Sequence, residues 1–197
     1  LAFRNAYRGM GFQRMIASKR LPPGRGEEPG ARGRFLHEAR LTGELRHPNV
    51  VGVLDLGEDD QGPYLLMDFV LGLSLGELSQ ALASRGVAIP VQLPLRIGAA
   101  VARALQAAHE ATDSSGEPLG LIHRDVSPNN VLVGFDGVVR LVDFGLARAL
   151  EDVRSGELLQ GTSGYVAPEQ LRFEPIDARA DLFALGVVLT ELASGER

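Results

Sequence analysis

The chain of 197 residues contains no cysteine and no tryptophan, and it has only four histidines. Without cysteine it can form no disulfide and no thiolate metal site, so a reducing compartment is the default and we predict a cytoplasmic location. The histidines, at positions 37, 47, 109 and 123, include no pair spaced to bind zinc from one helix.

Long apolar runs and an excess of positive charge are also missing. The longest apolar stretch, residues 182–193, contains Glu191 and falls short of the roughly 18 residues needed to span a bilayer. The formal net charge is −5, whereas nucleic-acid backbones are bound by basic surfaces. We therefore expect no membrane segment in this chain and no nucleic acid as its main partner.

The chain does have the apolar content of a folded protein, with 45% hydrophobic residues. Apolar, β-branched runs at 49–59 and 62–70 flank a turn and predict a hairpin. Periodicity and capping signals predict helices at 35–46, 74–86, 93–111 and 178–195. Because strands come first and helices dominate later, we expect an α+β fold with two lobes, residues 1–70 and 71–197.

One of the expected helices carries a carboxylate on its inward side. Residues 21–34 are rich in glycine, proline and charge and predict an exposed loop before this helix. Four residues then fall on one helical face, namely Glu38, Leu41, Thr42 and Leu45. Glu38 either lies at the helix edge with its head group in solvent or pairs with a cation.

Three oxygen-bearing side chains are spaced so that folding could bring them together. Asp125 and Asn130 lie in one expected loop, and Asp143 follows a predicted hairpin that could fold it back beside them. Converging oxygen ligands can hold a hard cation such as Mg²⁺, and a further carboxylate can accept a proton from an attacking hydroxyl. For any one of these residues a turn or cap role is the simpler interpretation, but it does not account for the combined pattern.

The sequence "HRDVSPNN" (123–130), followed in order by "DFG" (143–145) and "APE" (167–169), resembles the motifs of a eukaryotic-type (Hanks-type) serine/threonine protein kinase, the kind also found in bacteria. The stretches "IASK", "HPNVV", "YLLMDFV" and "DLFALGVVLTEL" extend the resemblance along the chain. It implies a bilobal protein-kinase fold, with a small β-rich N-lobe that includes helix C and a larger helical C-lobe ending after helix F.

The resemblance also implies roles for individual residues. Asp125 would be the catalytic base, and Asn130 and Asp143 would hold Mg²⁺. Lys19 would bind the α- and β-phosphates of ATP and pair with Glu38. The remaining nucleotide contacts would come from Ala17, Met67 (the gatekeeper), Asp68, Val70 and Leu132.

Several supporting roles follow from the same resemblance. Asp181 would brace the catalytic loop, and His123 would pack under Phe144 in the core. Arg124 would pair with a phosphate on the activation segment. The hydroxyls available there are Ser155, Thr162 and Ser163.

The sequence departs from the family pattern at two places. Ser127 stands where serine/threonine kinases usually have lysine, and the loss of a preorganised charge of this kind often costs about a few kcal/mol, so slow turnover is expected. The only glycine pair before Lys19, in "RGMGF" (8–12), fits the turn between the second and third strands. Strand one, the glycine-rich loop and the helices after helix F are therefore expected to be missing, as in a domain truncated at both ends.

The leading hypothesis is an enzyme that transfers the γ-phosphate of ATP, with Mg²⁺, to serine or threonine hydroxyls of a protein substrate. The alternative is a pseudokinase or inactive fragment that serves as a binding or regulatory module. The intact catalytic motifs favour the enzyme, whereas Ser127 and the missing glycine-rich loop favour the module.

Overall fold

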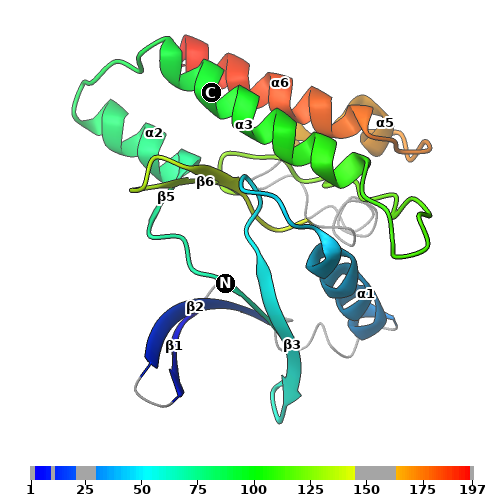
Figure 1. Ribbon diagram of the computed structural model, residues 1–197. Helices are drawn as coiled ribbons and strands as arrows, with labels where there is room; N and C mark the ends of the chain where they lie inside the picture. Colours follow the sequence, from blue (N-terminus) through cyan, green and yellow to red (C-terminus); the bar gives the residue numbers. More distant parts are fainter. Residues whose placement is uncertain (1–2, 10–11, 21–29, 145–162, 196–197) are drawn as a thin grey trace.

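The computed structural model describes residues 3–9, 12–20, 30–144 and 163–195, with only the backbone described at 3–9, 12, 13, 31, 34, 38 and 163. The described part contains one four-stranded and one three-stranded sheet. The larger sheet and one helix form the N-terminal end, and the smaller sheet lies beside a layer of helices (Figure 1). The expected α+β architecture is confirmed, while the residue limits of the two lobes stay a prediction.

The N-terminal sheet is antiparallel, in the order β1-β2-β4-β3. Its strands are β1 (Phe3–Gly9), β2 (Phe12–Arg20), β3 (Val53–Asp59) and β4 (Gly62–Asp68). Gly9 is paired with Phe12, so the short "RGMGF" stretch connects two strands, as its position predicted. In the β2–β4 register Ala17 lies opposite Met67, and the alternation of a strand places both side chains on one face of the sheet.

Helix α1 (Ala31–Glu44) packs against this sheet and begins earlier than expected. The prediction of a loop throughout 21–34 was wrong for residues 31–34. Alanine and arginine are good helix formers, and Gly30, in a left-handed conformation with φ 83°, leads into the helix. Phe35 and Ala39 of α1 are buried in one apolar cluster with Leu65 and Met67 of β4.

The second sheet joins segments from distant parts of the chain. It consists of β5 (Gly72–Ser74), β6 (Val131–Gly134) and β7 (Val139–Leu141), in that order. Leu141 N–H donates to Asn49 O at 2.8 Å, and Val51 N–H donates to Leu141 O at 2.9 Å. These two bonds tie the segment before β3 to β7, so the N-terminal part is fastened to the smaller sheet.

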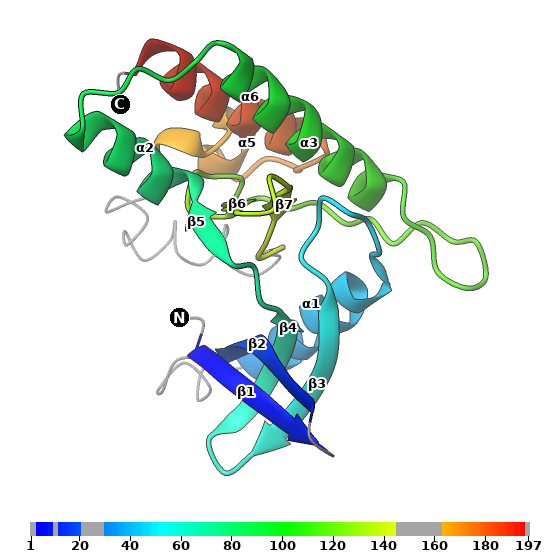
Figure 2. The same cartoon turned by 60° about the vertical axis from the view of Figure 1, so that its left-hand side comes forward.

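The C-terminal layer contains α2 (Leu75–Ser84), α3 (Gln92–His109), α5 (Pro168–Leu171) and α6 (Arg179–Ser194), with a 3₁₀ turn at Ser163–Tyr165. Helices α3 and α6 lie side by side in both views (Figures 1 and 2). Ile97, Val101 and Leu105 of α3 are almost wholly buried, as their spacing predicted, and they share a core with Leu185 and Val188 of α6.

No helix in the described ranges is both long and apolar to the degree that a membrane crossing requires.

The N-terminus of α2 provides a test of the local sequence signals. Ser74 Oγ accepts a hydrogen bond from Glu77 N–H at 3.2 Å, and Glu77 Oε2 accepts one from Ser74 N–H at 2.8 Å. Ser74→Ala removes one half of this capping box, so we expect the free energy of unfolding, measured by urea denaturation, to fall by about 1 kcal/mol. The matched control is Ser84→Ala, whose hydroxyl donates to the Ala81 carbonyl in the last turn at 3.0 Å. Equal stability of the two variants would contradict the capping role.

Candidate active site

The loop between α3 and β6 brings two of the sequence-predicted residues into direct contact. Asn130 Nδ2 donates to both the backbone oxygen and Oδ2 of Asp125, each at 2.8 Å. Asn130 N–H donates to Ser127 O at 3.0 Å, which closes the turn between them. Because the amide nitrogen is engaged in this way, the Oδ1 end of Asn130 is the end that can ligate a cation.

Asp143 reaches the same place from the end of β7. Val142 N–H donates to Asn130 O at 2.9 Å, so the residue before Asp143 is bonded to the loop. Asp143 Oδ1 lies 3.0 Å from Lys19 Nζ, with both side chains about one-third exposed or less. The structure therefore gathers Lys19 from β2, Asp143 from the end of β7 and Asn130 from the loop.

Two residues of the site have an unfavourable backbone conformation. Arg124 has φ 64° and Asp143 has φ 62°, in the left-handed region that side chains other than glycine rarely adopt. Such residues persist where surrounding contacts hold them, and they cluster at functional sites. Asp143 directly precedes Phe144, which is 1% exposed, and Arg124 directly precedes Asp125.

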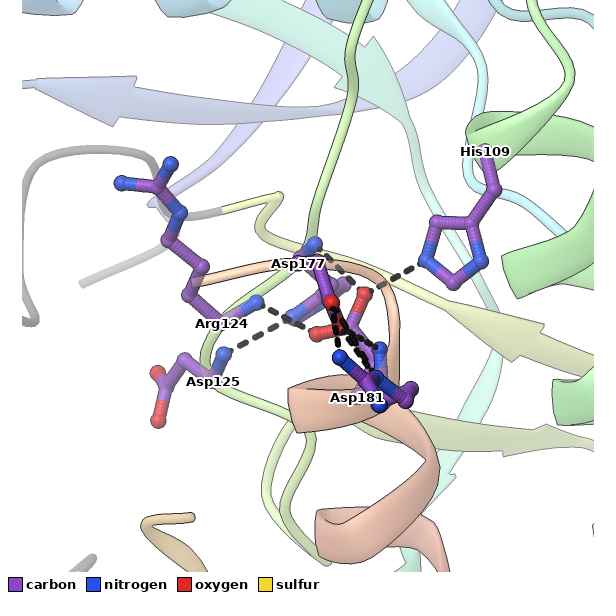
Figure 3. A network of polar contacts seen from close by, with 7 residues as sticks. His109, Arg124, Asp125, Asp177 and Asp181 are labelled. Carbon is purple, nitrogen blue, oxygen red and sulfur yellow. Dashed lines mark hydrogen bonds and ion pairs between the residues drawn. The ribbon is translucent and has the colours of Figure 1, made fainter. Parts of the chain in front are cut away.

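Asp181 of α6 supplies the contacts that hold the loop. This side chain has no exposed surface, and it accepts hydrogen bonds from His123 N–H at 2.9 Å, Arg124 N–H at 2.7 Å and His109 Nε2–H at 2.7 Å. Figure 3 shows this network, with His109 approaching from α3 and the Asp125 carboxylate directed away from Asp181. The bracing role expected for Asp181 is thus present as two backbone hydrogen bonds.

The start of α6 is fixed by Asp177, which lies beside the network in Figure 3. Its Oδ1 accepts from Arg179 N–H at 2.9 Å, and the Arg179 guanidinium donates to both carboxylate oxygens at 2.8–3.1 Å. These bonds lower the pKa of Asp177 to about 2. Asp181 lies about one turn further along the chain.

His123 belongs to the core, as expected. Its ring centroid lies 4.7 Å from that of Phe144. His123 Nε2–H donates to Val142 O at 3.0 Å, and Asp125 N–H donates to His123 Nδ1 at 3.3 Å. These partners require the neutral ring, since a protonated Nδ1 could not accept. Burial lowers the pKa of His123, against smaller opposing effects from Asp181, the Val142 carbonyl and the nearby carboxylates of Asp125 and Asp143.

Four of the residues expected around the nucleotide base belong to or pack against the apolar cluster of Phe35 and Leu65, as Val142 also does; the four are Ala17, Met67, Val70 and Leu132. Asp68, the remaining one, differs because it follows Met67 in β4 and its side chain points to the opposite face. There it forms an ion pair with Arg14 and borders an open groove of about 430 Å³. A nucleotide on the Met67 face could contact Asp68 only through its backbone.

Some predicted partners lie outside the described part of the chain. Glu38 is placed on α1 by its backbone, but its side chain is outside the description, so the pairing with Lys19 stays a prediction. The hydroxyls expected on the activation segment also lie outside the described part of the chain; they are those of Ser155, Thr162 and Ser163. Arg124 Nε is buried and has no hydrogen-bond partner within the described ranges.

The oxygen donors of the site suit a cation that phosphate helps to bind. Within the described residues no group of three or more His, Cys, Asp or Glu side chains could hold a metal ion by itself. Asp143 and Asn130 offer a carboxylate and an amide oxygen on two segments that the bond from Val142 N–H to Asn130 O joins, and such hard donors suit Mg²⁺ when phosphate and water complete its coordination. The residues present therefore fit a nucleotide-bound Mg²⁺ and do not fit a free-standing metal centre.

Sequence reasoning missed three residues of the site. Val142 packs against the apolar cluster of Phe35 and Leu65, and its position beside "DFG" was an available signal. His109 bonds to Asp181 and Gln170 bonds to Arg124, across 72 and 46 residues respectively. No local pattern in the sequence points to either of these long-range contacts.

Comparison with known proteins gives a consistent result. The model of the protein kinase domain matches residues 5–197. The chain is 38% identical to the tyrosine-protein kinase MasK of Myxococcus xanthus over 184 residues, covering 92% of this chain and 28% of that protein. It is 34% identical to the serine/threonine-protein kinase PknB of Mycobacterium leprae over 196 residues, covering 96% of this chain and 30% of that protein.

Among solved structures, the kinase domain of PknI from Mycobacterium tuberculosis is similar, with a TM-score of 0.74 and 32% sequence identity. The match covers 98% of this chain and 69% of the PknI chain. The chain thus spans less than a third of the length of MasK and PknB and about two thirds of the PknI kinase domain.

The neutral state of His123 predicts a pH dependence of stability. Its pKa in the folded protein is below the unfolded value of 6.5, so below pH 6.5 the unfolded chain binds a proton that the folded chain does not. We expect the free energy of unfolding to fall as the pH drops below 6.5, by at most about 1.4 kcal/mol per pH unit from this residue. In His123→Phe, which keeps a ring against Phe144 but cannot titrate, urea unfolding at pH 7 and pH 5 should show a smaller difference. The natural protein and the His123→Phe variant share the other three histidines. An equal pH dependence of their stability would therefore refute a neutral His123 in the folded protein.

Proposed function

Because the chain belongs to the protein kinase family, we propose that it transfers the γ-phosphate of ATP to serine or threonine hydroxyls of a protein. The observation that carries this proposal is the convergence of Asp125, Asn130 and Asp143 with Lys19 from the other sheet. The side-chain contacts are Asn130 with Asp125 and Lys19 with Asp143, and the backbone bond from Val142 N–H to Asn130 O links the two pairs. A turn or cap role for each residue would not require this arrangement.

Asp125 is the proposed base. Its carboxylate is half-buried and is oriented by the 2.8 Å bond from Asn130 Nδ2. A carboxylate held in this way can orient the substrate hydroxyl and accept its proton as the oxygen attacks phosphorus. The buried Arg124 Nε suits an anionic partner, which agrees with the expectation of a phosphate from the activation segment.

Asn130 and Asp143 are proposed to hold Mg²⁺, which when bound neutralises negative charge on the phosphates. Lys19 is proposed to bind the α- and β-phosphates, and its contact with Asp143, a proposed Mg²⁺ ligand, supports this role. Glu38 on α1 remains the proposed partner of Lys19. The base would lie against the group of Ala17, Met67, Val70 and Leu132, with Asp68 contributing its backbone.

The acceptor is proposed to be serine or threonine in a protein substrate in the cytoplasm. The motifs resemble the serine/threonine pattern except at Ser127, and PknB of Mycobacterium leprae is named as a serine/threonine kinase. MasK is named as a tyrosine kinase, so the identity of the phosphorylated residue is a direct test. Phosphoamino-acid analysis should detect phosphoserine or phosphothreonine, and phosphotyrosine alone would contradict this assignment.

One observation favours a second candidate, a kinase-shaped binding module. Ser127 is 3% exposed and carries no charge, so it cannot replace the cation that related enzymes place near the γ-phosphate. A module of this kind would bind Mg-ATP without transferring phosphate. Slow turnover is the outcome expected if the first candidate is correct.

Substitution of the two aspartates separates the candidates. Incubated with radiolabelled Mg-ATP and a basic protein substrate, the natural protein should incorporate phosphate, and Asp125→Asn should reduce the rate at least about 100-fold because the base is lost. Asp143→Asn should reduce it similarly and also weaken the dependence on Mg²⁺.

The matched control is Asp136→Asn, an exposed turn carboxylate paired with Arg140, which should leave the rate unchanged. Nucleotide binding by the natural protein with no phosphate transfer would support the module. Undiminished transfer in Asp143→Asn would contradict the proposed metal site.

A further inference from the structure

The peptide bond between Arg124 and Asp125 is fixed by contacts on both sides of Arg124. Arg124 N–H donates to Asp181 Oδ1 at 2.7 Å. Arg124 O, which belongs to the peptide bond with Asp125, accepts from Gln170 Nε2 at 3.1 Å. Since Arg124 has φ 64°, its conformation is unfavourable by itself and depends on such contacts.

Gln170 is a buried amide with both ends engaged. Its side chain comes from α5 and the residue is 2% exposed. Gln170 Oε1 accepts from Ala167 N–H at 3.1 Å. This bond settles the orientation of the amide, because an oxygen facing the N–H of Ala167 leaves the NH₂ group facing Arg124 O.

We propose that Gln170 is a positioning residue for Asp125, acting through the carbonyl of Arg124. Rotation of the peptide bond would turn the Cα of Asp125 and disturb the 2.8 Å bond between its carboxylate and Asn130. Gln170 therefore couples α5, which follows the activation segment, to the orientation of the proposed base. This inference rests on the proposed function in assigning Asp125 as the base, but the contact itself does not depend on catalysis.

Two substitutions test the role in different ways. Gln170→Met keeps the size of the side chain but cannot hydrogen-bond Arg124 O, so kcat should fall about 5- to 50-fold with the KM for ATP nearly unchanged. In Gln170→Glu the carboxylate still accepts from Ala167 N–H but opposes the Arg124 carbonyl. When protonated, the same group donates to that carbonyl again.

The two variants should therefore differ in their pH profiles. The kcat of Gln170→Glu relative to the natural protein should rise as the pH falls and its carboxyl becomes protonated, whereas the ratio for Gln170→Met should stay flat. A purely structural role in α5 predicts no such recovery. The matched controls are Gln106→Met and Gln106→Glu, since Gln106 is an exposed glutamine of α3 bonded to Glu110, and both should keep the natural kcat.

Amide hydrogen exchange separates failure of this inference from failure of the proposed function. Peptides covering residues 123–126 should exchange faster in Gln170→Met than in the natural protein, with or without catalysis. If the natural protein transfers no phosphate, faster exchange still supports the positioning contact, whereas unchanged exchange overturns it. If the natural protein is active, an unchanged kcat in both Gln170 variants overturns the inference. Should Gln170→Met fail to fold, the pH profile and exchange of Gln170→Glu decide the question.

Discussion

The buried carboxylate of Asp181 is the interaction on which the candidate site depends. A carboxylate withdrawn from water is strongly destabilising unless hydrogen bonds replace its hydration, and here three donors do so. Two of these donors are the backbone N–H groups of His123 and Arg124, the residues just before Asp125. The charge therefore joins the core helix α6 to the loop, and removing it would leave two buried N–H groups without an acceptor.

A loop held in this way can keep left-handed backbone conformations that are unfavourable by themselves. The left-handed residues Arg124 and Asp143 each cost of the order of 1–3 kcal/mol. Arg124 is held by hydrogen bonds to both its N–H and its carbonyl oxygen. Asp143 lies between Val142, whose carbonyl accepts a hydrogen bond from His123, and Phe144, whose ring packs against that of His123. The strain is thus concentrated at the two backbone positions that bring Asp125 and Asp143 together.

The elements that could be predicted are those with a local physical cause. Helix α2 begins directly after Ser74 because the side chains and backbone N–H groups of Ser74 and Glu77 hydrogen-bond one another within a single turn. Helix α3 buries the stripe that its periodicity indicated. Strand β5 was missed because three residues contain no usable period. It pairs along its length with β6, a partner found nearly sixty residues later. The early start of α1 was missed because residues 31–34, which include favourable helix formers, belong to a stretch rich in glycine and proline that predicts a loop.

For the site, the sequence by itself determined the order and spacing of Asp125, Asn130 and the "DFG" aspartate. Asp125 and Asn130 are five positions apart and one hairpin separates Asn130 from Asp143, so short-range geometry limits how far apart these groups can lie. Only the tertiary structure decided which distant side chains hold the loop around Asp125, among them His109 through Asp181 and Gln170 through the Arg124 carbonyl. Such contacts result from the packing of whole elements, which is the sum of many weak apolar interactions. No local preference of the chain encodes that sum.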